Sequence, residues 1–271
     1  MKYFAGIDIG STAIKIVLID ESKNIVAHQT SPTGSHFQRN SLECLAALLA
    51  KTGIKKEDVE YMISTGYGRK LFKEADESTS EITANAAGAR HFSTNNGNVK
   101  TIINIGGQDS KVILLDNDGH IKNFAMNDKC AAGTGRFLEM TARNLGIEVD
   151  DLGDLHLKAK GIPLSINSTC TVFAESEIIG LLANGHEKEE IIAGVHYSIA
   201  KRIVRLAGRL GVEDRVFFDG GPAMNKGLVA AMDDELMRNV VVPEIPQITT
   251  ALGGALIARD AFLSKGEKFY A

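Results

Sequence analysis

Apolar residues along the chain follow two periodicities, which predict a series of strands and helices. A strand is predicted from Tyr3 to Ile9, and the alternation of apolar and polar positions resumes from Ile14 to Ile19 after a small-residue turn. A further short strand is predicted near residues 25–30. An amphipathic helix over 37–49 and a strand over 61–64 come next. This mixture of elements predicts an α/β fold.

The first part of this pattern occurs twice. The segment from Ile103 to Asp116 aligns without gaps on the segment from Ile7 to Asp20, and it keeps Ile, Gly, Lys, Leu and Asp in place. A polar turn and a short strand follow each copy, the second near residues 121–125. A duplicated strand-turn-strand unit predicts two similar domains, each offering a glycine turn to one side of a cleft. One ligand held by both turns would fit this arrangement.

The first glycine turn has the composition of a phosphate-binding turn. Gly10, Ser11 and Thr12 let backbone N–H groups approach a phosphate closely and add hydroxyl groups. Asp8 is placed to hold a metal ion through water, and Lys15 adds positive charge. The turn is not a Walker P-loop, because no Gly-Lys-Ser or Gly-Lys-Thr opens a helix here. A tight hairpin that binds no ligand is the alternative interpretation.

The second half of the chain contains a later glycine turn. A long helix is predicted over 190–210, and the strand Val216 to Asp219 leads into Gly220 and Gly221. Two adjacent glycines would let a flat ring or its sugar lie against the backbone, although a purely structural turn explains them equally well. A strand over 240–242 and a helix over 249–262 are predicted to complete the chain.

A polar segment divides the pattern into two domains. Asn95, Asn96, Gly97 and Asn98 form the clearest linker, directly after helical spacing that ends near Phe92. We therefore predict a first domain of residues 1–97 together with 250–271. The second predicted domain is residues 98–249, which contains the repeated turn and two of the cysteines.

Composition limits the classes of function. The 271 residues are 44% apolar and 24% charged, with a net charge of −4, which gives no electrostatic reason to expect nucleic acid as a partner. Neither a secretory signal nor an apolar run of membrane-spanning length is found. Three cysteines are an odd number and do not suit a disulfide framework. The expected location is therefore a reducing cytoplasm.

Two of the three cysteines precede predicted helices. Small residues follow Cys130 before a helical pattern that Gly146 ends, and a similar pattern follows Cys170. Unpaired N–H groups and the helix dipole favour a thiolate at such a position. Cys44 lies among leucines in the middle of a predicted helix, so we interpret it as a core residue. Two inert buried thiols are the alternative for the other pair.

The phosphate turn, its repeat and the late Gly-Gly turn together resemble the superfamily of acetate and sugar kinases, actin and chaperone ATPases. The resemblance implies an α/β fold of two similar ribonuclease-H-like domains, the actin and sugar-kinase ATPase fold, with a nucleotide cleft between them. The glycine turns belong to this wide superfamily. The motifs around the cysteines are more specific.

Five motifs spread over the chain look like the activators of 2-hydroxyacyl-CoA dehydratases, which are ATPases of the BadF/BadG/BcrA/BcrD type. They are Gly-Ile-Asp-Ile-Gly-Ser-Thr, Ser-Thr-Gly-Tyr-Gly-Arg, Ile-Gly-Gly-Gln-Asp, Asn-Asp-Lys-Cys-Ala-Ala-Gly-Thr-Gly-Arg-Phe and Ser-Thr-Cys-Thr-Val-Phe-Ala-Glu-Ser-Glu. The resemblance implies a homodimer that shares one [4Fe-4S] cluster, with Cys130 and Cys170 as ligands from each subunit. Four thiolates are what a cubane requires, and a two-fold axis doubles the two that one chain offers.

The resemblance also implies the nucleotide contacts. Gln108 is the candidate for orienting the attacking water, and Asp8 and Asp109 are candidate Mg²⁺ partners through water. The remaining candidates contact ATP or ADP: the phosphates at Ser11, Thr12, Ala13, Ile14, Lys15, Gly106 and Gly107, and the adenosine at Gly220, Gly221 and Gln247. Pro222 replaces the β-branched residue that relatives often have, which leaves the adenine contact open.

ATP hydrolysis in this family drives single low-potential electrons into a partner enzyme. The resemblance ranks a 2-hydroxyacyl-CoA dehydratase first as acceptor, and an aromatic-ring CoA reductase or another double-cluster protein remains possible. It implies ferredoxin or flavodoxin as donor, and an interface cluster predicts sensitivity to oxygen. A sugar or acetate kinase and a purely regulatory ATPase are the two alternatives. We expect the helix ends at the cysteines to raise the cluster potential, which ATP-driven movement would then change.

Overall fold

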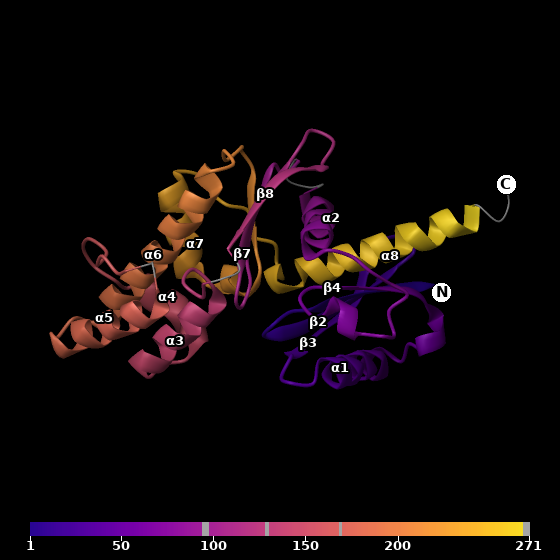
Figure 1. The fold of residues 1–271 in the computed structure, drawn as a ribbon, viewed down its shortest axis with the longest axis horizontal. Coiled ribbons are helices and arrows are strands. Elements are labelled where there is room, and N and C mark those ends of the chain that lie inside the picture. The colour runs from indigo at the N-terminus through magenta and orange to yellow at the C-terminus, as the bar shows by residue number, and fades with distance from the viewer. Residues whose placement is uncertain (94–97, 128–129, 168–169, 268–271) are drawn as a thin grey trace. The chain divides into compact units, whose positions relative to one another are not determined.

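The computed structural model describes residues 1–93, 98–127, 130–167 and 170–267 (Figure 1). Of the linker predicted over 95–98, residues 95–97 lie outside the described residues. Contacts divide the chain into two compact units. Residues 1–98, 119–121 and 247–271 form unit 1, and residues 99–118 and 122–246 form unit 2. The predicted domains, residues 1–97 with 250–271 and residues 98–249, stay a prediction.

Unit 1 is built on a five-stranded sheet with the strand order β3-β2-β1-β4-β5. The β1–β2 and β2–β3 pairs are antiparallel, whereas β4 runs parallel to both β1 and β5. The β1–β2 hairpin and the third strand lie where the apolar alternation predicted them. The strands are β1 (Tyr3–Ile9), β2 (Ala13–Asp20), β3 (Ile25–Pro32), β4 (Val59–Thr65) and β5 (Glu77–Ser78).

Helices cover both faces of this sheet. The helices of unit 1 are α1 (Phe37–Thr52), α2 (Glu81–Ser93) and α8 (Thr249–Glu267), with 3-10 turns η1 (Lys56–Asp58) and η2 (Arg69–Leu71). Because side chains alternate along a strand, Ile7 and Ile9 of β1 join the core beneath α1. Phe4 instead packs against Phe262 of α8, with the two rings tilted by 57°. Gly6 lets α8 approach closely, since a Cβ there would lie 1.9 Å from the Ala251 carbonyl oxygen.

Unit 2 repeats the strand arrangement on a four-stranded sheet with the order β8-β7-β6-β9. The β6–β7 pair is antiparallel and β9 runs parallel to β6, as β4 does to β1. The register is also repeated, because Asp8 pairs with Lys15 and the aligned Asn104 pairs with Lys111. The predicted duplication is therefore confirmed. The strands are β6 (Thr101–Ile105), β7 (Ser110–Leu115), β8 (Ile121–Asn127) and β9 (Val216–Asp219).

Five helices of unit 2 enclose a second core. They are α3 (Gly135–Leu145), α4 (Leu152–His156), α5 (Thr171–Ala183), α6 (Lys188–Gly208) and α7 (Lys226–Leu236), with 3-10 turns η3 (Val149–Asp151) and η4 (Gly221–Met224). The turn η5 (Pro246–Ile248) precedes α8. Helix α6 is the centre of this core, since most of its apolar side chains are fully buried. It contacts α3, α4, α5 and α7.

The strand predicted over 240–242 is wrong. Only Val241 forms a bridge, to Phe217, through hydrogen bonds from Val241 N to Val216 O and from Phe218 N to Val241 O. Pro243 follows two residues later and has no N–H to donate to a ladder. The pairing therefore ends after one residue.

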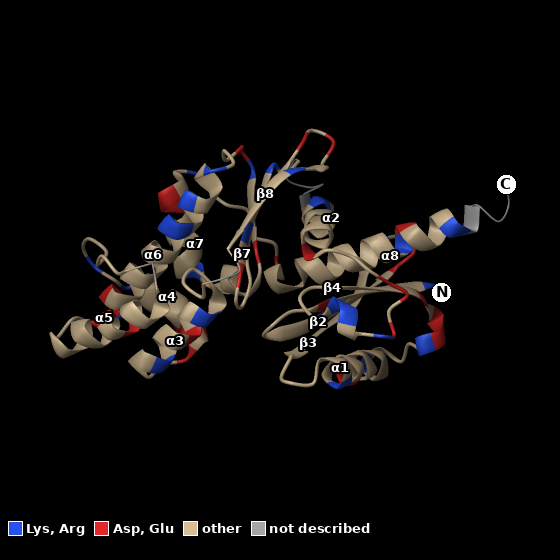
Figure 2. Ribbon diagram, viewed as in Figure 1, with Lys and Arg blue, Asp and Glu red and all other residues tan. Residues whose placement is uncertain are grey.

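Lys and Arg residues and Asp and Glu residues both occur along the helices of both units (Figure 2). This mixture accords with the net charge of −4. Among the residues that the structure describes, no helix combines the length and the apolar character needed to cross a bilayer.

A buried histidine pair joins three helices of unit 2. His196 of α6 and His156 of α4 stack with ring centroids 4.9 Å apart, and their Nδ1 atoms lie 2.9 Å apart. Asn225, the N-cap of α7, accepts from Leu228 N and donates through Nδ2 to His196 Nε2 at 3.1 Å. His196 Nδ1 must then carry the proton and donate to His156 Nδ1. Both rings are therefore neutral.

The same pair makes unfolding dependent on pH. Burial lowers the pKa of His156. The pKa of His196 lies well below 6.5, mainly because the ring is buried and, to a smaller extent, because His156 lies next to it. A histidine whose pKa is lowered by folding stays neutral in the folded protein. Its full contribution to stability is present at a pH above the pKa that the same histidine has in the unfolded chain, and the contribution is lost as the pH falls.

We predict that the free energy of unfolding falls between pH 7.5 and 5.5, by about 1.4 kcal/mol for each histidine that stays neutral in the fold. Denaturant titrations at both pH values measure this loss. His196→Gln should reduce it, whereas His36→Gln, at an exposed position, should not. Equal losses in the wild type and His196→Gln would contradict the assignment.

Candidate functional site

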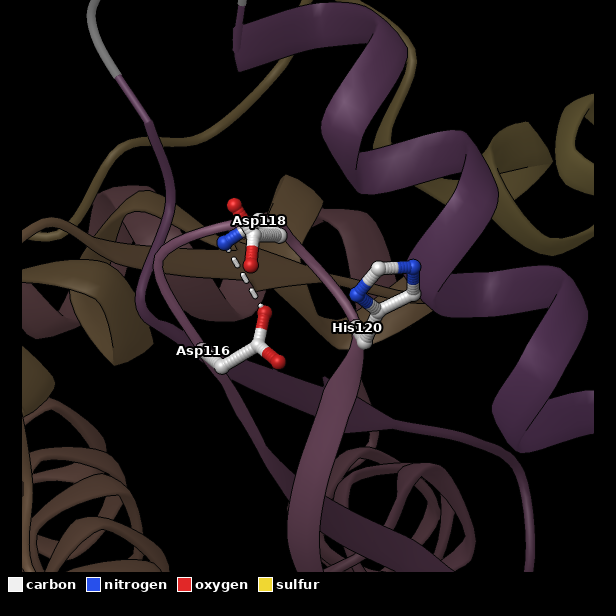
Figure 3. A group of neighbouring side chains, drawn as sticks. All are labelled: Asp116, Asp118 and His120. Atoms are coloured by element: carbon white, nitrogen blue, oxygen red, sulfur yellow. Dashed lines mark hydrogen bonds between the residues drawn. The ribbon is translucent and has the colours of Figure 1, made fainter.

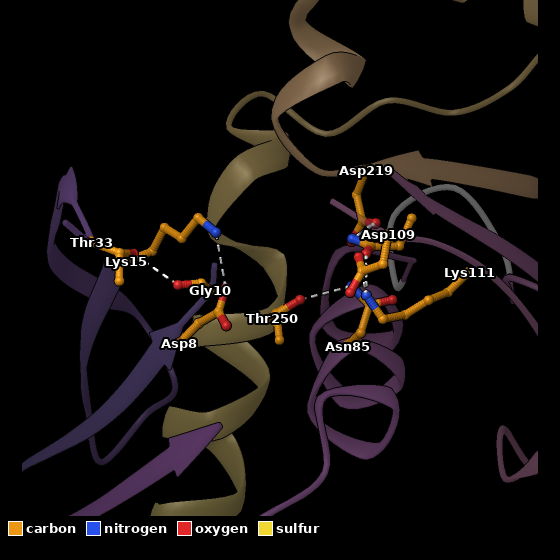
Figure 4. Close-up of polar contacts among 10 residues, drawn as sticks. Asp8, Gly10, Lys15, Thr33, Asn85, Asp109, Lys111, Asp219 and Thr250 are labelled. Carbon is orange, nitrogen blue, oxygen red and sulfur yellow. Dashed lines mark hydrogen bonds and ion pairs between the residues drawn. The ribbon is translucent and has the colours of Figure 1, made fainter. Parts of the chain in front are cut away.

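The first predicted phosphate turn is closed by one backbone bond and held by one threonine. Gly10 N donates to Ala13 O at 3.1 Å. Thr33, just after β3, donates from its N to Thr12 O and from its Oγ1 to Gly10 O at 2.8 Å (Figure 4). Because Thr33 donates hydrogen bonds to both carbonyl oxygens, these two carbonyl groups of the turn point toward Thr33. The Thr12 hydroxyl oxygen is buried and has no partner among the described residues.

A carboxylate and an ammonium group lie beside this turn. Lys15 Nζ contacts Asp8 Oδ2 at 3.2 Å, and both side chains are largely buried. Gly66 at the end of β4 leaves room for Asp8, since a Cβ there would lie 2.4 Å from Asp8 Oδ1. Unit 1 thus brings together Asp8 and the predicted phosphate-binding segment from Ser11 to Lys15.

The second turn repeats the backbone geometry of the first. Gly106 N donates to Asp109 O at 2.9 Å, as Gly10 does to Ala13. Lys111 Nζ, almost completely buried, contacts Asp109 Oδ1 at 2.7 Å, and Figure 4 shows this pair. Each turn therefore presents one carboxylate paired with one lysine, and the lysines are equivalent in the repeat.

The carboxylates are not equivalent. The repeat aligns Asp8 with Asn104, whose Oδ1 lies 3.5 Å from Lys111 Nζ. Asn104 Nδ2 also donates to Asp219 Oδ1 at 2.7 Å. Asp219 ends β9 and is completely buried. Neither Asn104 nor Asp219 was predicted as a site residue, although the alignment of Asn104 on Asp8 was a usable signal.

The turn at Gly220 and Gly221, after β9, has a counterpart in the turn at Gly66, after β4, since both begin with a glycine at positive φ. Gly220 has φ +93° and Gly66 has φ +84°. A Cβ at Gly220 would lie 2.1 Å from Ile105 O, and one at Gly66 would lie 2.7 Å from the aligned Ile9 O. Both positions therefore require glycine. At Gly221 a Cβ would meet nothing within 4 Å, so packing does not require glycine at this position.

The two candidate metal-ligating thiols both lie in unit 2. Cys130 and Cys170 are free cysteines of intermediate burial, whereas Cys44 is buried in α1 and its pKa is raised by that burial. Cys170 is the N-cap residue of α5, as predicted. Cys130 is not at a cap, because Thr134 caps α3 and residues 131–133 intervene. The dipole argument therefore applies directly only to Cys170, since the effect decays within one helical turn.

The start of α3 is bonded to the second glycine turn. Gly135 N donates to Gly106 O at 2.9 Å, and Arg136 N donates to Gly107 O at 3.0 Å. With the Gln108 carboxamide oxygen facing α3, this oxygen accepts from Arg136 Nε and Nη2, both at 3.0 Å. The segment after Cys130 is thus attached to the turn that carries Gln108 and Asp109.

A family model of the BadF/BadG/BcrA/BcrD ATPase family matches residues 5–258. The chain belongs to this family. The activator of lactoyl-CoA dehydratase from Anaerotignum propionicum is 46% identical over 265 residues, which cover 97% of this chain and 100% of that protein.

Solved structures agree with the fold. The activator of the 2-hydroxyisocaproyl-CoA dehydratase from Clostridium difficile, with bound ADPNP, matches with a TM-score of 0.92 at 44% identity. That match covers 98% of this chain and 97% of the other. A ROK family glucokinase from Streptomyces griseus matches with a TM-score of 0.59 at 13% identity, covering 95% and 99% of the two chains. The predicted actin and sugar-kinase ATPase fold is confirmed.

For this ATPase of the BadF/BadG/BcrA/BcrD family, the structure groups the predicted site residues within each unit. Unit 2 contains Gly106 to Asp109 together with Gly220, Gly221 and both cysteines, and Gln247 lies in η5. Their roles toward nucleotide and metal stay predictions.

Thr33 and Arg136 were not predicted as site residues. Nothing in the local pattern marked Thr33, whereas Arg136 closes the Gly-Thr-Gly-Arg motif after Cys130.

A separate group of possible ligands lies in the turn between β7 and β8 (Figure 3). Asp116, Asp118 and His120 each offer one ligand atom, and these atoms lie within 4.8 Å of one another. Asp118 N donates to Asp116 Oδ1 at 2.9 Å, which is the usual role of an aspartate in such a turn. We therefore assign this group to turn formation.

The fold requires glycine at position 220 but not at position 221. We predict that Gly220→Ala destabilises this ATPase by at least about 2 kcal/mol, because alanine is disfavoured at positive φ and its Cβ would overlap Ile105 O. Gly221→Ala should change stability by less than about 0.5 kcal/mol. Thermal unfolding compares the two variants. A Gly221→Ala protein as unstable as Gly220→Ala would contradict this assignment.

Proposed function

We propose that this protein is an ATP-hydrolysing electron donor that activates a 2-hydroxyacyl-CoA dehydratase. One observation carries the proposal. Two partly exposed cysteines precede helices in the unit that also holds a phosphate-type turn, and the first residues of α3 are hydrogen-bonded to that turn. A kinase would leave both thiols without a role. Nearly full-length similarity to the lactoyl-CoA dehydratase activator supports the choice of partner.

The thiols fit a [4Fe-4S] cluster shared by two subunits. Thiolates are the ligands of such clusters, and a cubane takes four. Cys130 and Cys170 supply two from each chain, and burial of Cys44 in the α1 core removes it from consideration. When bound, the cluster would accept and release one electron at low potential. Cys130 and Cys170 would hold it, and the α5 N-terminus would favour its negative charge.

Exposed apolar side chains beside Cys170 support a homodimer. Val172 and Phe173, in the first turn of α5, are 65% and 66% exposed. Large apolar groups next to each other on a surface mark protein interaction sites. A two-fold axis near Cys170 would bury these side chains and bring four thiols together. In this proposal the cluster binds only to the dimer, because one chain supplies two of the four thiolates.

The two glycine turns are proposed to bind the phosphates of ATP. In unit 1 the backbone from Ser11 to Lys15 would contact phosphate oxygens, and the buried, unpartnered Thr12 hydroxyl suits such an acceptor. In unit 2 Gly106 and Gly107 would do the same. Asp8 and Asp109 would hold Mg²⁺ through water, which would free their paired lysines for phosphate. Gly220, Gly221 and Gln247 would contact adenosine.

The electron donor, the location, the effect of oxygen and the acceptor are further proposals. We propose ferredoxin or flavodoxin as the electron donor, a cytoplasmic location and loss of the cluster in oxygen. An aromatic-ring CoA reductase is the alternative acceptor. Mixing the reduced protein and ATP with each candidate acceptor, and measuring reduction of its clusters, decides between them.

Anaerobic purification with cysteine variants tests the proposal. We predict about four irons per dimer in the wild type and loss of most iron in Cys130→Ser and Cys170→Ser, because serine is a poor cluster ligand. Cys44→Ser is the matched control, since its thiol is buried in the α1 core, and it should keep the iron if it folds. Iron analysis and size-exclusion chromatography give the readouts.

Two outcomes would contradict the proposal. One is a colourless monomer that phosphorylates a sugar or acetate with ATP, which would favour the kinase. The other is full iron content in both Cys130→Ser and Cys170→Ser. An iron-containing dimer that hydrolyses ATP but reduces none of the acceptors would reject only the choice of partner.

A further inference from the structure

The contact between Gln108 and Arg136 restricts what Gln108 can do. A carboxamide oxygen has two lone pairs, and Arg136 Nε and Nη2 fill both at 3.0 Å. The Gln108 amino group can only donate hydrogen bonds. In this arrangement Gln108 therefore cannot accept a hydrogen bond from a water molecule, which the role proposed for it in hydrolysis requires.

The contact is also placed to open easily. Both side chains are exposed, so water can replace each hydrogen bond when the pair separates. Beneath it, the bonds from Gly135 N to Gly106 O and from Arg136 N to Gly107 O join the backbones. Any shift of the turn that frees Gln108 therefore pulls on the first turn of α3.

The segment before α3 is held at its other end. Asn127, at the end of β8, donates from Nδ2 to Cys130 O at 3.0 Å, and Arg202 of α6 donates to Asn127 Oδ1 at 3.5 Å. Thr134 Oγ1 donates to Ala131 O at 2.7 Å, which closes the loop between Cys130 and α3. Movement of α3 at Arg136 is therefore transmitted to this short loop.

We propose that Arg136 is a positioning residue that holds Gln108 out of the hydrolytic arrangement and couples its release to α3 and the Cys130 loop. This inference rests on the proposed function. Hydrolysis then needs the contact open: Gln108 Oε1 orients a water, the water oxygen attacks the γ-phosphorus, the bond to the bridging oxygen breaks, ADP leaves and the proton passes to the released phosphate. Arg136 thereby delays hydrolysis until its contact with Gln108 opens, and movement of α3 with the turn favours that opening.

The first test is ATP hydrolysis by the dimer without an electron acceptor. A contact that is closed about nine-tenths of the time limits hydrolysis to about one-tenth of its maximum, so Arg136→Met should raise the rate by up to about tenfold. In a second assay, with an electron acceptor present, the ratio of ATP hydrolysed to electrons transferred should rise in Arg136→Met. Arg136→Lys, which keeps the charge and one donor at a time, should give an intermediate rate.

Matched variants show whether Arg136 acts through Gln108. Arg143→Met removes the same charge from the last turn of the same helix, where Arg143 is 74% exposed, and should leave the rate and the ratio unchanged. The double variant Arg136→Met with Gln108→Ala should hydrolyse ATP no faster than Gln108→Ala alone. A double variant as fast as Arg136→Met, or a wild-type rate in Arg136→Met, would overturn the proposal.

Hydrogen exchange on the wild-type protein provides a test that needs neither variants nor electron transfer. The amides of Gly135 and Arg136 should exchange faster with a non-hydrolysable ATP analogue than with ADP, because the analogue shifts the turn to which they are bonded. Equal exchange in the two nucleotides would reject the coupling. Failure of the proposed function would instead appear as a wild-type protein that is purified without iron.

Discussion

One backbone hydrogen bond, made twice, positions the charged groups of the candidate site. Gly10 N to Ala13 O and Gly106 N to Asp109 O close the same turn between antiparallel strands. Each bond fixes the register of the two strands, and the register brings a lysine to the residue it pairs with, Lys15 to Asp8 and Lys111 to Asn104. The phosphate-type turn and its charges are thus consequences of one local geometry.

The two copies then diverge where their chemistry differs. The carboxylate before the first turn is replaced by Asn104 in the second, which donates to the buried Asp219, and the second turn carries its own carboxylate at Asp109. The copy in unit 2 is also the one joined to α3 and hence to the Cys130 segment. A duplicated scaffold has therefore acquired an asymmetric connection, which suits a protein that links nucleotide hydrolysis to a second event.

Local patterns predicted most of the fold because a short-range period is set by residues close together in the chain. The apolar alternation located β1 to β3, the helical spacing of apolar residues located α1, small residues located the turns, and the repeat located β6 to β8. The failure at 240–242 arose from the same reasoning, since three valines favour a strand but Pro243 ends the pairing after Val241. Thr33 was missed because its partners lie more than twenty residues away.

The sequence by itself determined the duplicated strand-turn-strand unit, the two cysteine segments and the family, since these are properties of residue order and spacing. Only the tertiary structure decided that Gly220 is required by the approach of Ile105 while Gly221 is not, that Thr134 rather than Cys130 caps α3, and that Arg136 contacts Gln108. The approach of Ile105 to Gly220 and the contact of Arg136 with Gln108 join segments distant in sequence, so packing decides them and no local preference does. The first residue of α3 is a local feature, but the small residues after Cys130 left the start of the helix open.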